Sequence, residues 1–236
     1  MTLPEPLETE VLENRKFTKD TFLLKLKLPK PLDFRAGQFI QTITQIKDKK
    51  IRRSWSIASS PNIKDYIELL IKSQNENSLI SSKLLKIKPK NKVTIQGPFG
   101  VFRIITPYKK EIFFIAAGVG VAPLRSMILD LLENKINTNI TLIFGFKAEQ
   151  DYLLKEEWKK LQKKYKNFKF IPVISRPQTQ TELFTGRVTN LLPNLLKPSE
   201  DKDFYICGPP IMITDTVQVL GSIGFTKKQI HIERWQ

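Results

Sequence analysis

The sequence predicts a β + α/β fold, in which a small antiparallel β-barrel precedes a parallel α/β domain. Up to about residue 107, the chain consists of short β-branched or aromatic runs separated by turn residues, as in small barrels. Beyond that point, apolar runs alternate with helical stretches, which indicates a parallel sheet. With 236 residues, 41% of them hydrophobic, the chain is long enough for two cores. We therefore expect domains over residues 1–107 and 108–236.

In the first domain, four runs have the length and composition of strands. One of them, residues 21–28, alternates over its second half as a half-buried strand does. The turn residues Gly97-Pro98-Phe99-Gly100 are expected to close the last run, and one short helix fits residues 78–85. The expected strands are 21–28, 39–46, 66–71 and 93–95.

In the second domain, strands and helices are expected to alternate. Residues 112–117 are continuously apolar, as in a strand buried on both faces of a sheet. A glycine turn and a helical stretch follow at once. The expected strands are 112–117, 140–144, 168–174, 203–207 and 230–232, and the expected helices are 123–133, 153–165 and 212–220.

Composition limits the possible partners and cofactors. A net charge of +16 indicates first a solvated lysine-rich surface, next an acidic protein partner and only distantly nucleic acid, for which no motif is present. One cysteine and one histidine exclude an iron–sulfur cluster or a zinc site built on these residues. No apolar run approaches the ~20 residues of a membrane span. The first ten residues carry no basic side chain, so no targeting signal is expected and we predict a cytoplasmic protein.

The segment Gly118-Val119-Gly120-Val121-Ala122-Pro123 follows a predicted buried strand and opens a predicted helix. Glycines there let the backbone approach a phosphate, and a helix N-terminus offers free N–H groups. Pro123 suits the first turn of the helix, where its missing donor costs nothing. Taken alone, the segment fits a tight strand-to-helix turn equally well.

A second segment, Cys207-Gly208-Pro209-Pro210, also lies where a strand ends and a helix begins. Ligands of parallel α/β sheets bind at these carboxyl ends. A small thiol at the strand tip fits against an aromatic ring. For a lone cysteine, a buried structural role is the usual alternative.

A third segment, Arg53-Ser54-Trp55-Ser56-Ile57-Ala58-Ser59-Ser60-Pro61, belongs to the strand-rich half. We expect Arg53, Trp55 and a serine to lie on one face of a strand, where they offer a phosphate clamp, a stacking surface and a hydroxyl group. A flavin nucleotide needs these three groups. Standing alone, the segment fits an ordinary barrel strand with Trp55 in the core better.

Together these segments resemble the motifs of the ferredoxin–NADP⁺ reductase family, in the same order from about residue 8 to the C-terminus. Two further segments share the resemblance: Gly37-Gln38-Phe39 and Gly97-Pro98-Phe99-Gly100. The resemblance implies a six-stranded flavin-binding barrel and an NAD(P)-binding α/β domain. It implies an NAD(P)H-dependent flavoprotein reductase with FAD, less readily FMN, and a separate acceptor such as ferredoxin or flavodoxin. The alternative is an electron-transfer subunit of a larger complex with little activity alone.

On the flavin side, the resemblance assigns four residues. Arg53 binds the flavin phosphate, and Trp55, where the family usually has tyrosine, stacks on the isoalloxazine ring. Ser56 bonds near the flavin nitrogen that accepts hydride. Ser81 caps the flavin phosphate at a helix start, although Ser78 stands where the family has glycine.

On the nicotinamide side, the resemblance implies that Gly118, Gly120 and Pro123 cradle the nucleotide. Cys207 lies near the hydride-bearing carbon, and Gly208 and Pro209 leave room for the ring.

The C-terminus and one loop complete the expected site. By the resemblance, Trp235 covers the flavin until nicotinamide displaces it, and Glu233 supports the site electrostatically. Ser175 and Arg176 follow a predicted strand where relatives hold the extra phosphate of NADPH, yet similar residues occur in relatives that use NADH. The choice between NADH and NADPH therefore stays open.

Overall fold

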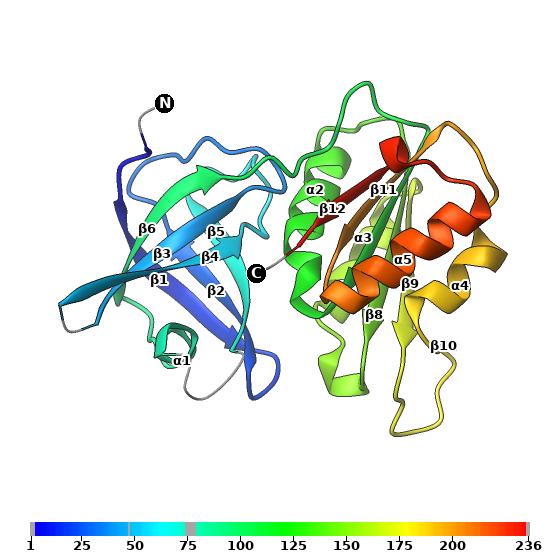
Figure 1. Ribbon diagram of the computed structural model, residues 1–236. Coiled ribbons are helices and arrows are strands. Elements are labelled where there is room, and N and C mark those ends of the chain that lie inside the picture. Colours follow the sequence, from blue (N-terminus) through cyan, green and yellow to red (C-terminus); the bar gives the residue numbers. More distant parts are fainter. Residues whose placement is uncertain (1–2, 47, 74–78, 235–236) are drawn as a thin grey trace. The chain divides into compact units, whose positions relative to one another are not determined.

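The computed structural model describes residues 3–46, 48–73 and 79–234, and the chain divides into two compact units (Figure 1). One unit comprises Met1–Arg103 and Arg125–Asp130, and the other comprises Ile104–Leu124 and Leu131–Gln236. The sequence placed the boundary near residue 107. The units change at Arg103, and six residues of a later helix also belong to the first unit.

The first unit is a six-stranded antiparallel sheet with the strand order β4-β3-β6-β1-β2-β5, which confirms the predicted fold class. An isolated antiparallel bridge joins Ile57, directly after β4, to Leu69 in β5 and so links the two edges of the sheet into a barrel. The elements are β1 (Leu7–Lys16), β2 (Thr21–Lys27), β3 (Phe39–Ile46), β4 (Lys49–Ser56), β5 (Tyr66–Lys72), α1 (Leu79–Leu85) and β6 (Lys92–Phe99).

Two expectations for this unit were incomplete. The strand β1 was not predicted, because its glutamates interrupt the apolar pattern on which the prediction rested. The predicted turn at Gly97-Pro98-Phe99-Gly100 was wrong in its first part, since β6 continues through Phe99. Gly97 has a φ of +149°, and a β-carbon there would lie 2.9 Å from Cγ2 of Ile40. Glycine is needed at this position because β6 passes very close to β3.

The second unit is a six-stranded parallel sheet with the order β10-β9-β8-β7-β11-β12, as predicted for an α/β domain. The strands are β7 (Glu111–Ala117), β8 (Asn139–Phe146), β9 (Phe168–Ile174), β10 (Phe184–Thr185), β11 (Lys202–Cys207) and β12 (Ile230–Glu233). The α-helices are α2 (Val121–Glu133), α3 (Lys155–Lys164), α4 (Val188–Leu195) and α5 (Pro210–Ile223). Short 3₁₀ turns are η1 (Gly118–Gly120), η2 (Glu149–Asp151) and η3 (Lys227–Gln229).

Residues on one face of this sheet form an apolar core with α4 and α5, including Ile206 of β11, Leu192 of α4 and Leu220 of α5. On the other face, Trp158 of α3 is fully buried and its ring stacks on that of Phe170 in β9. The helix α4 and the strand β10 were not predicted. Pro193 interrupts the helical pattern of α4, and β10 has only two residues, so hydrophobic periodicity reveals neither element.

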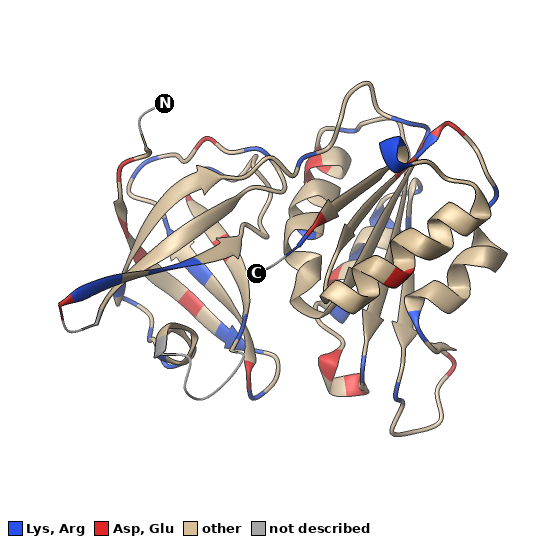
Figure 2. Ribbon diagram, viewed as in Figure 1, with Lys and Arg blue, Asp and Glu red and all other residues tan. Residues whose placement is uncertain are grey.

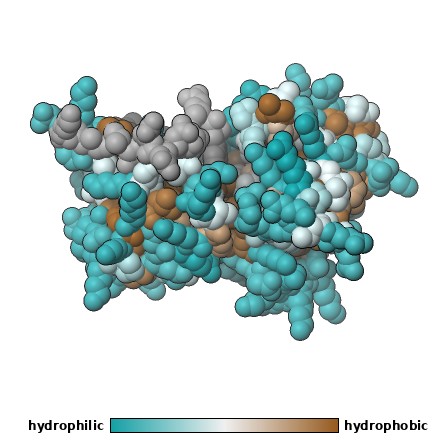
Figure 3. Space-filling model, turned by 90° about the horizontal axis from the view of Figure 1, so that it is seen from below, coloured by the Kyte–Doolittle hydropathy of each residue, from teal (hydrophilic) through white to brown (hydrophobic). Residues whose placement is uncertain are grey.

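Within the described ranges, no helix combines the length and the apolar character that crossing a bilayer requires. Hydrophilic side chains cover most of the face shown in Figure 3, with apolar side chains in scattered areas between them.

Candidate functional site

The predicted flavin-side residues lie at the end of β4, but not all on one face. Strand alternation places Arg53 and Trp55 on the same face of β4 and Ser56 on the opposite face. The expectation of a shared face was therefore wrong for the serine. Arg53 is exposed, whereas Trp55 and Ser56 are partly buried. The arginine thus offers its guanidinium group to solvent at the edge of the barrel.

Trp55 is held from the barrel side. Its indole N–H donates a hydrogen bond of 2.9 Å to Oγ1 of Thr42 in β3, and its ring packs against the barrel core. In the hairpin of β3 and β4, Trp55 pairs with Ile40, and Thr42 pairs with Arg53. The alternative interpretation, with Trp55 in the core of the barrel, is therefore partly correct, since the residue is partly buried and packs against that core.

Gln38 fixes the chain next to this hairpin. Its side-chain carbonyl accepts the N–H of Arg35, and its amide donates to the carbonyl of Gly100 at 3.2 Å. Its backbone carbonyl accepts the N–H of Ile57 at 3.0 Å, directly after the Arg53–Ser56 segment. Gly37 precedes it with a φ of +97°, a conformation that other residues rarely adopt. The glycine–glutamine pair therefore positions the end of β4.

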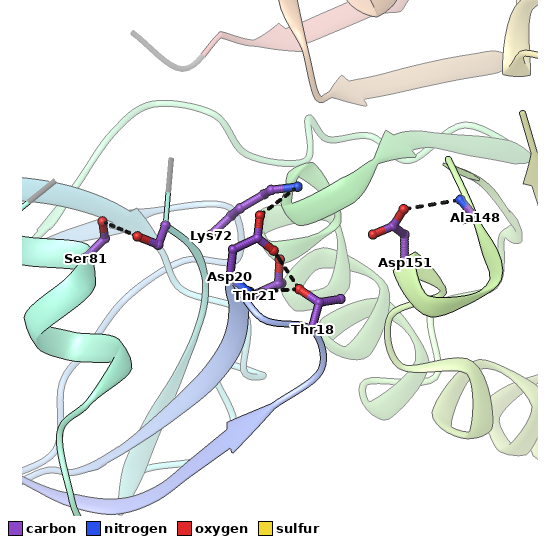
Figure 4. A network of polar contacts seen from close by, with 8 residues as sticks. Thr18, Asp20, Thr21, Lys72, Ser81, Ala148 and Asp151 are labelled. Atoms are coloured by element: carbon purple, nitrogen blue, oxygen red, sulfur yellow. Dashed lines mark hydrogen bonds and ion pairs between the residues drawn. The ribbon is translucent and has the colours of Figure 1, made fainter. Parts of the chain in front are cut away.

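Ser81 lies in the first turn of α1 and is buried, with its hydroxyl oxygen 3.1 Å from that of Ser73. This bond joins α1 to the end of β5. Next to it, Asp20 accepts hydrogen bonds from the hydroxyl groups of Thr18 and Thr21 and pairs with Lys72 at 3.5 Å (Figure 4). The turn before β2 and the end of β5 are thus tied together. Whether Ser81 caps a flavin phosphate stays a prediction.

A buried ion pair of the first unit joins α2 to β5. Nη1 of Arg125 lies 2.7 Å from Oε2 of Glu68 in β5 and donates to the carbonyl of Ala58 at 2.7 Å. The neighbouring hydroxyl of Ser126 donates to the carbonyl of Ser59 at 2.7 Å. These contacts hold the middle of α2 against the segment that follows Ser56.

In the second unit, two glycine turns meet at the carboxyl ends of β7 and β11, which are neighbours in the sheet. A β-carbon on Gly120 would lie 2.4 Å from the carbonyl oxygen of Cys207. Gly118 has a φ of +55°, and a β-carbon there would meet no atom within 4 Å. The backbone is therefore packed tightly at Gly120 and open at Gly118. An open glycine directly before a helix suits the close approach of a phosphate.

Cys207 and Glu233 end adjacent parallel strands and are paired in register. Cys207 is fully buried, while Glu233 is partly buried, and burial raises the pKa of its carboxyl group. After Cys207, Gly208 packs tightly, since a β-carbon there would lie 2.4 Å from Cε of Met212. Pro209 is the N-cap residue of α5, which begins at Pro210. The positions of Cys207 and Gly208 agree with a ring-binding role, which stays a prediction.

Ser175 and Arg176 extend the pairing of β8 and β9 beyond the strand ends. The N–H of Ser175 donates to the carbonyl of Phe146, and that of Arg176 donates to the carbonyl of Lys147. Both side chains are exposed. The carboxylate of Glu149 accepts the N–H groups of Gln178 and Thr179, which fixes the loop that follows. Ser175 and Arg176 lie at the carboxyl end of the parallel strands, the same edge of the sheet that carries the glycine turns.

Pro123 lies in the first turn of α2, as expected. Trp235 and Ser78 fall outside the described residues, so the proposed role of Trp235 as a cover of the flavin stays a prediction.

Thr42 and Arg125 were not predicted from the sequence. Arg125 had a detectable signal, because it is a lone charge in the apolar stretch 121–129 and Glu68 is a lone charge within the apolar run 67–71.

Family models match most of the chain. The oxidoreductase FAD-binding domain matches residues 8–104, and the oxidoreductase NAD-binding domain matches residues 114–218. The chain is 29% identical to the phenol hydroxylase P5 protein of Acinetobacter pittii, covering 99% of this chain and 66% of that protein. It is 30% identical to a subunit of the Na⁺-translocating NADH-quinone reductase of Serratia proteamaculans, with 96% and 67% covered. The chain thus spans about two thirds of the length of these relatives.

Solved structures with the same fold include a ferredoxin–NADP⁺ reductase from Neisseria gonorrhoeae with bound FAD and NADP. It has a TM-score of 0.84 at 23% identity, with 97% of this chain and 98% of that chain covered. The CS and b5R domains of human Ncb5or in the NAD⁺ form give a TM-score of 0.85 at 26% identity, with 98% and 70% covered.

Proposed function

Because this chain belongs to the ferredoxin–NADP⁺ reductase-like family of FAD- and NAD-binding oxidoreductases, we propose that it moves electrons between NAD(P)H and a separate acceptor through bound FAD. The observation that carries the proposal is the presence of both cofactor-binding domains in one chain, matched over residues 8–104 and 114–218. A chain with both domains has one place to bind the electron donor and another to bind the carrier.

The residues described above are suited to bind both FAD and a nicotinamide nucleotide. Arg53 is exposed beside Trp55, whose N–H is already bonded within the barrel, so the indole ring is left to offer its face. A planar aromatic ring stacks well on such a face. On the other unit, the open space at Gly118 and the start of α2 suit a phosphate group.

In this function the protein positions the cofactors rather than supplying acid or base catalysts. Bound FAD supplies the chemistry, since it takes up electrons as a pair and releases them singly or in pairs. Arg53 would bind its phosphate, Trp55 would orient its ring, and Ser56 would donate a hydrogen bond to it. Gly208 and Pro209 would admit the nicotinamide ring beside Cys207, and Ser175 and Arg176 would meet the far end of the nucleotide. Trp235 would act as the movable cover of the flavin.

We propose an acidic protein as the acceptor. The net charge is +16, and exposed basic residues follow one another along β4 (Figure 2): Lys49, Lys50, Arg52 and Arg53. A surface of one sign attracts a partner of the opposite sign and speeds their association at low salt. The single cysteine cannot hold an iron–sulfur cluster, and we propose that the acceptor group belongs to a separate molecule. We further propose a cytoplasmic location, which agrees with a chain that has no second cysteine for an internal disulfide.

A second candidate function is that of an electron-transfer subunit with little activity alone. Its support is the 30% identity to a subunit of a Na⁺-translocating NADH-quinone reductase. The two functions differ in one measurable property. An independent reductase reduces a small oxidant such as ferricyanide at a high rate with NAD(P)H alone, whereas a dependent subunit turns over slowly until its complex is reconstituted.

The test is an anaerobic visible spectrum of the purified protein before and after separate additions of NADH and NADPH. We expect a yellow protein that bleaches with at least one of the two, and the effective one identifies the donor. A protein that stays colourless and cannot be reconstituted with FAD or FMN would overturn the proposed function.

A further inference from the structure

We propose that Thr42 is a positioning residue for the flavin, which it influences by fixing the orientation of the Trp55 ring. This inference rests on the proposed function, because it concerns the same stacking site. The observation behind it is the hydrogen bond of 2.9 Å from the indole N–H of Trp55 to Oγ1 of Thr42.

The bond uses the only polar group of the tryptophan side chain. An indole has one N–H donor and no acceptor. With that donor directed into the barrel at Thr42, Trp55 can offer a ligand only the face of its ring. Its contact with a flavin is therefore determined entirely by the ring's tilt and depth.

Thr42 is suited to fix that tilt. It is fully buried in β3 and pairs with Arg53, two residues from Trp55 on the adjacent strand. Diagonal cross-strand neighbours of this kind lie within reach of a large aromatic side chain. A β-branched side chain has little χ1 freedom, so the acceptor oxygen is as fixed as the strand itself. Turning the indole away would leave a buried hydroxyl group without this donor.

Packing supports the same orientation. Trp55 contacts the barrel core through its apolar atoms, and Ile40, its direct partner in β3, is fully buried in that core. Hydrogen bond and packing thus both hold the ring from the barrel side, while Arg53 on the same face of β4 remains exposed. Thr42 acts through Trp55 and need not touch the flavin.

The test is a double-mutant cycle on the flavin-bound protein, with Thr42→Val and Thr42→Ser made in the wild-type and in a Trp55→Phe background. Valine removes the acceptor with little change of shape, and serine retains it. Phenylalanine retains an aromatic face without the donor. The readouts are the FAD dissociation constant, the visible circular dichroism of bound FAD, and the solvent exchange rate of the Trp55 indole proton in NMR spectra.

We expect Thr42→Val to raise the FAD dissociation constant about fivefold, the order of one neutral hydrogen bond, and to speed exchange of the indole proton. Thr42→Ser should stay within about twofold of wild type. In the Trp55→Phe background, Thr42→Val should have no further effect, because coupled residues are not additive.

An equal effect of Thr42→Val in both backgrounds would show that the threonine acts on the barrel and not through Trp55, and would overturn the inference. So would wild-type FAD affinity and circular dichroism in Thr42→Val. In either case, the proposed function survives as long as the wild-type protein binds FAD. A wild-type protein that binds no flavin would overturn both.

Discussion

The backbone of Gly120 lies so close to Cys207 that a β-carbon would come within 2.4 Å of the cysteine carbonyl oxygen and within 2.7 Å of Cα of Gly208. Both of these are backbone atoms, which cannot rotate aside. The turn after β7 and the turn after β11 are thus packed as one structure. A change at one of them must move the other.

Gly120→Ala should therefore weaken both folding and nicotinamide binding. Forcing a methyl group into a packed site costs about 1–3 kcal/mol, and here it would separate the two turns. We expect a lower free energy of unfolding in urea and a higher KM for the nicotinamide cofactor. Gly221→Ala is the matched control, since a β-carbon there would meet no atom within 4 Å and the residue lies inside α5. This control should be neutral or up to about 1 kcal/mol more stable. Unchanged stability and KM in Gly120→Ala would contradict the packing argument.

Arg53→Ala should lower the affinity for FAD. A hydrogen bond to a charged group contributes about 1.5–3 kcal/mol, so the dissociation constant should rise roughly 10- to 100-fold. The measurement is a fluorescence titration of FAD into the apoprotein. Arg52→Ala is the control, because Arg52 is also exposed but lies on the opposite face of β4. Equal losses in both variants would indicate a general effect of charge rather than a phosphate contact.

Removal of one partner of the Arg125–Glu68 pair should destabilise the protein strongly. The two side chains are 9% and 13% exposed, so Arg125→Met would leave the carboxylate of Glu68 buried without its cation. Breaking a buried pair in this way costs about 3–5 kcal/mol. Lys159→Met removes the exposed pair with Glu156 and should change stability by less than about 1 kcal/mol. Urea unfolding of the wild type, Arg125→Met and Lys159→Met measures both changes in stability. A similarly small change in the two variants would show that the Arg125–Glu68 pair is not a strong contribution to stability.

Glu233 should give the protein a stability that falls as the pH rises. Burial raises the pKa of this carboxyl group above its ordinary value of 4.5, so the folded state binds its proton more tightly than the unfolded state does. The resulting stabilisation is fully present below pH 4.5 and is lost as the pH rises through the raised pKa. Glu233→Gln does not titrate. Its stability relative to wild type should therefore increase as the pH rises above 4.5 and through the raised pKa of Glu233, as measured by thermal unfolding.

Asp20 provides a control of opposite sign. Partial burial acts to raise its pKa, but hydrogen bonds from Thr18 and Thr21 and the charge of Lys72 outweigh burial and lower it. Its contribution to stability is therefore present above pH 3.8 and is lost as the pH falls through the lowered pKa. Asp20→Asn should become less stable relative to wild type as the pH rises from about 2 to 5. If the stabilities of Glu233→Gln and Asp20→Asn relative to wild type changed with pH in the same direction, the pKa shift assigned to at least one of the two carboxyl groups would be wrong.

For some elements, the sequence predicts the first and last residues correctly. The strands at 39–46 and 168–174 were predicted with their observed ends, because each is an apolar-rich run bounded by polar or turn residues. The glycine turn before α2 was predicted because Gly118 and Gly120 directly follow the apolar run 112–117, and Pro123 suits the first turn of the helix that comes next. The strand β1 was not predicted, since what makes it a strand is its pairing with β2 and β6, more than its own composition.

The site was predicted less completely, for reasons of distance along the chain. Arg125 finds Glu68 at a separation of 57 residues, and Trp55 finds Thr42 at a separation of 13. Local patterns do not contain such pairings, which follow only from strand register and tertiary packing. The face of Ser56 was predicted wrongly for a simpler reason. It directly follows Trp55, and neighbours in a strand point to opposite sides.

The division of α2 between the two units affects any attempt to dissect this protein. A fragment that ends at Arg103 contains Glu68 and the carbonyl groups of Ala58 and Ser59 but lacks Arg125 and Ser126, which bond to them. The complementary fragment carries that arginine without its carboxylate. Neither piece is a self-sufficient module, although the chain looks divisible at a single peptide bond. Gene fusions and domain exchanges with relatives should therefore transfer α2 together with the barrel strands that it contacts.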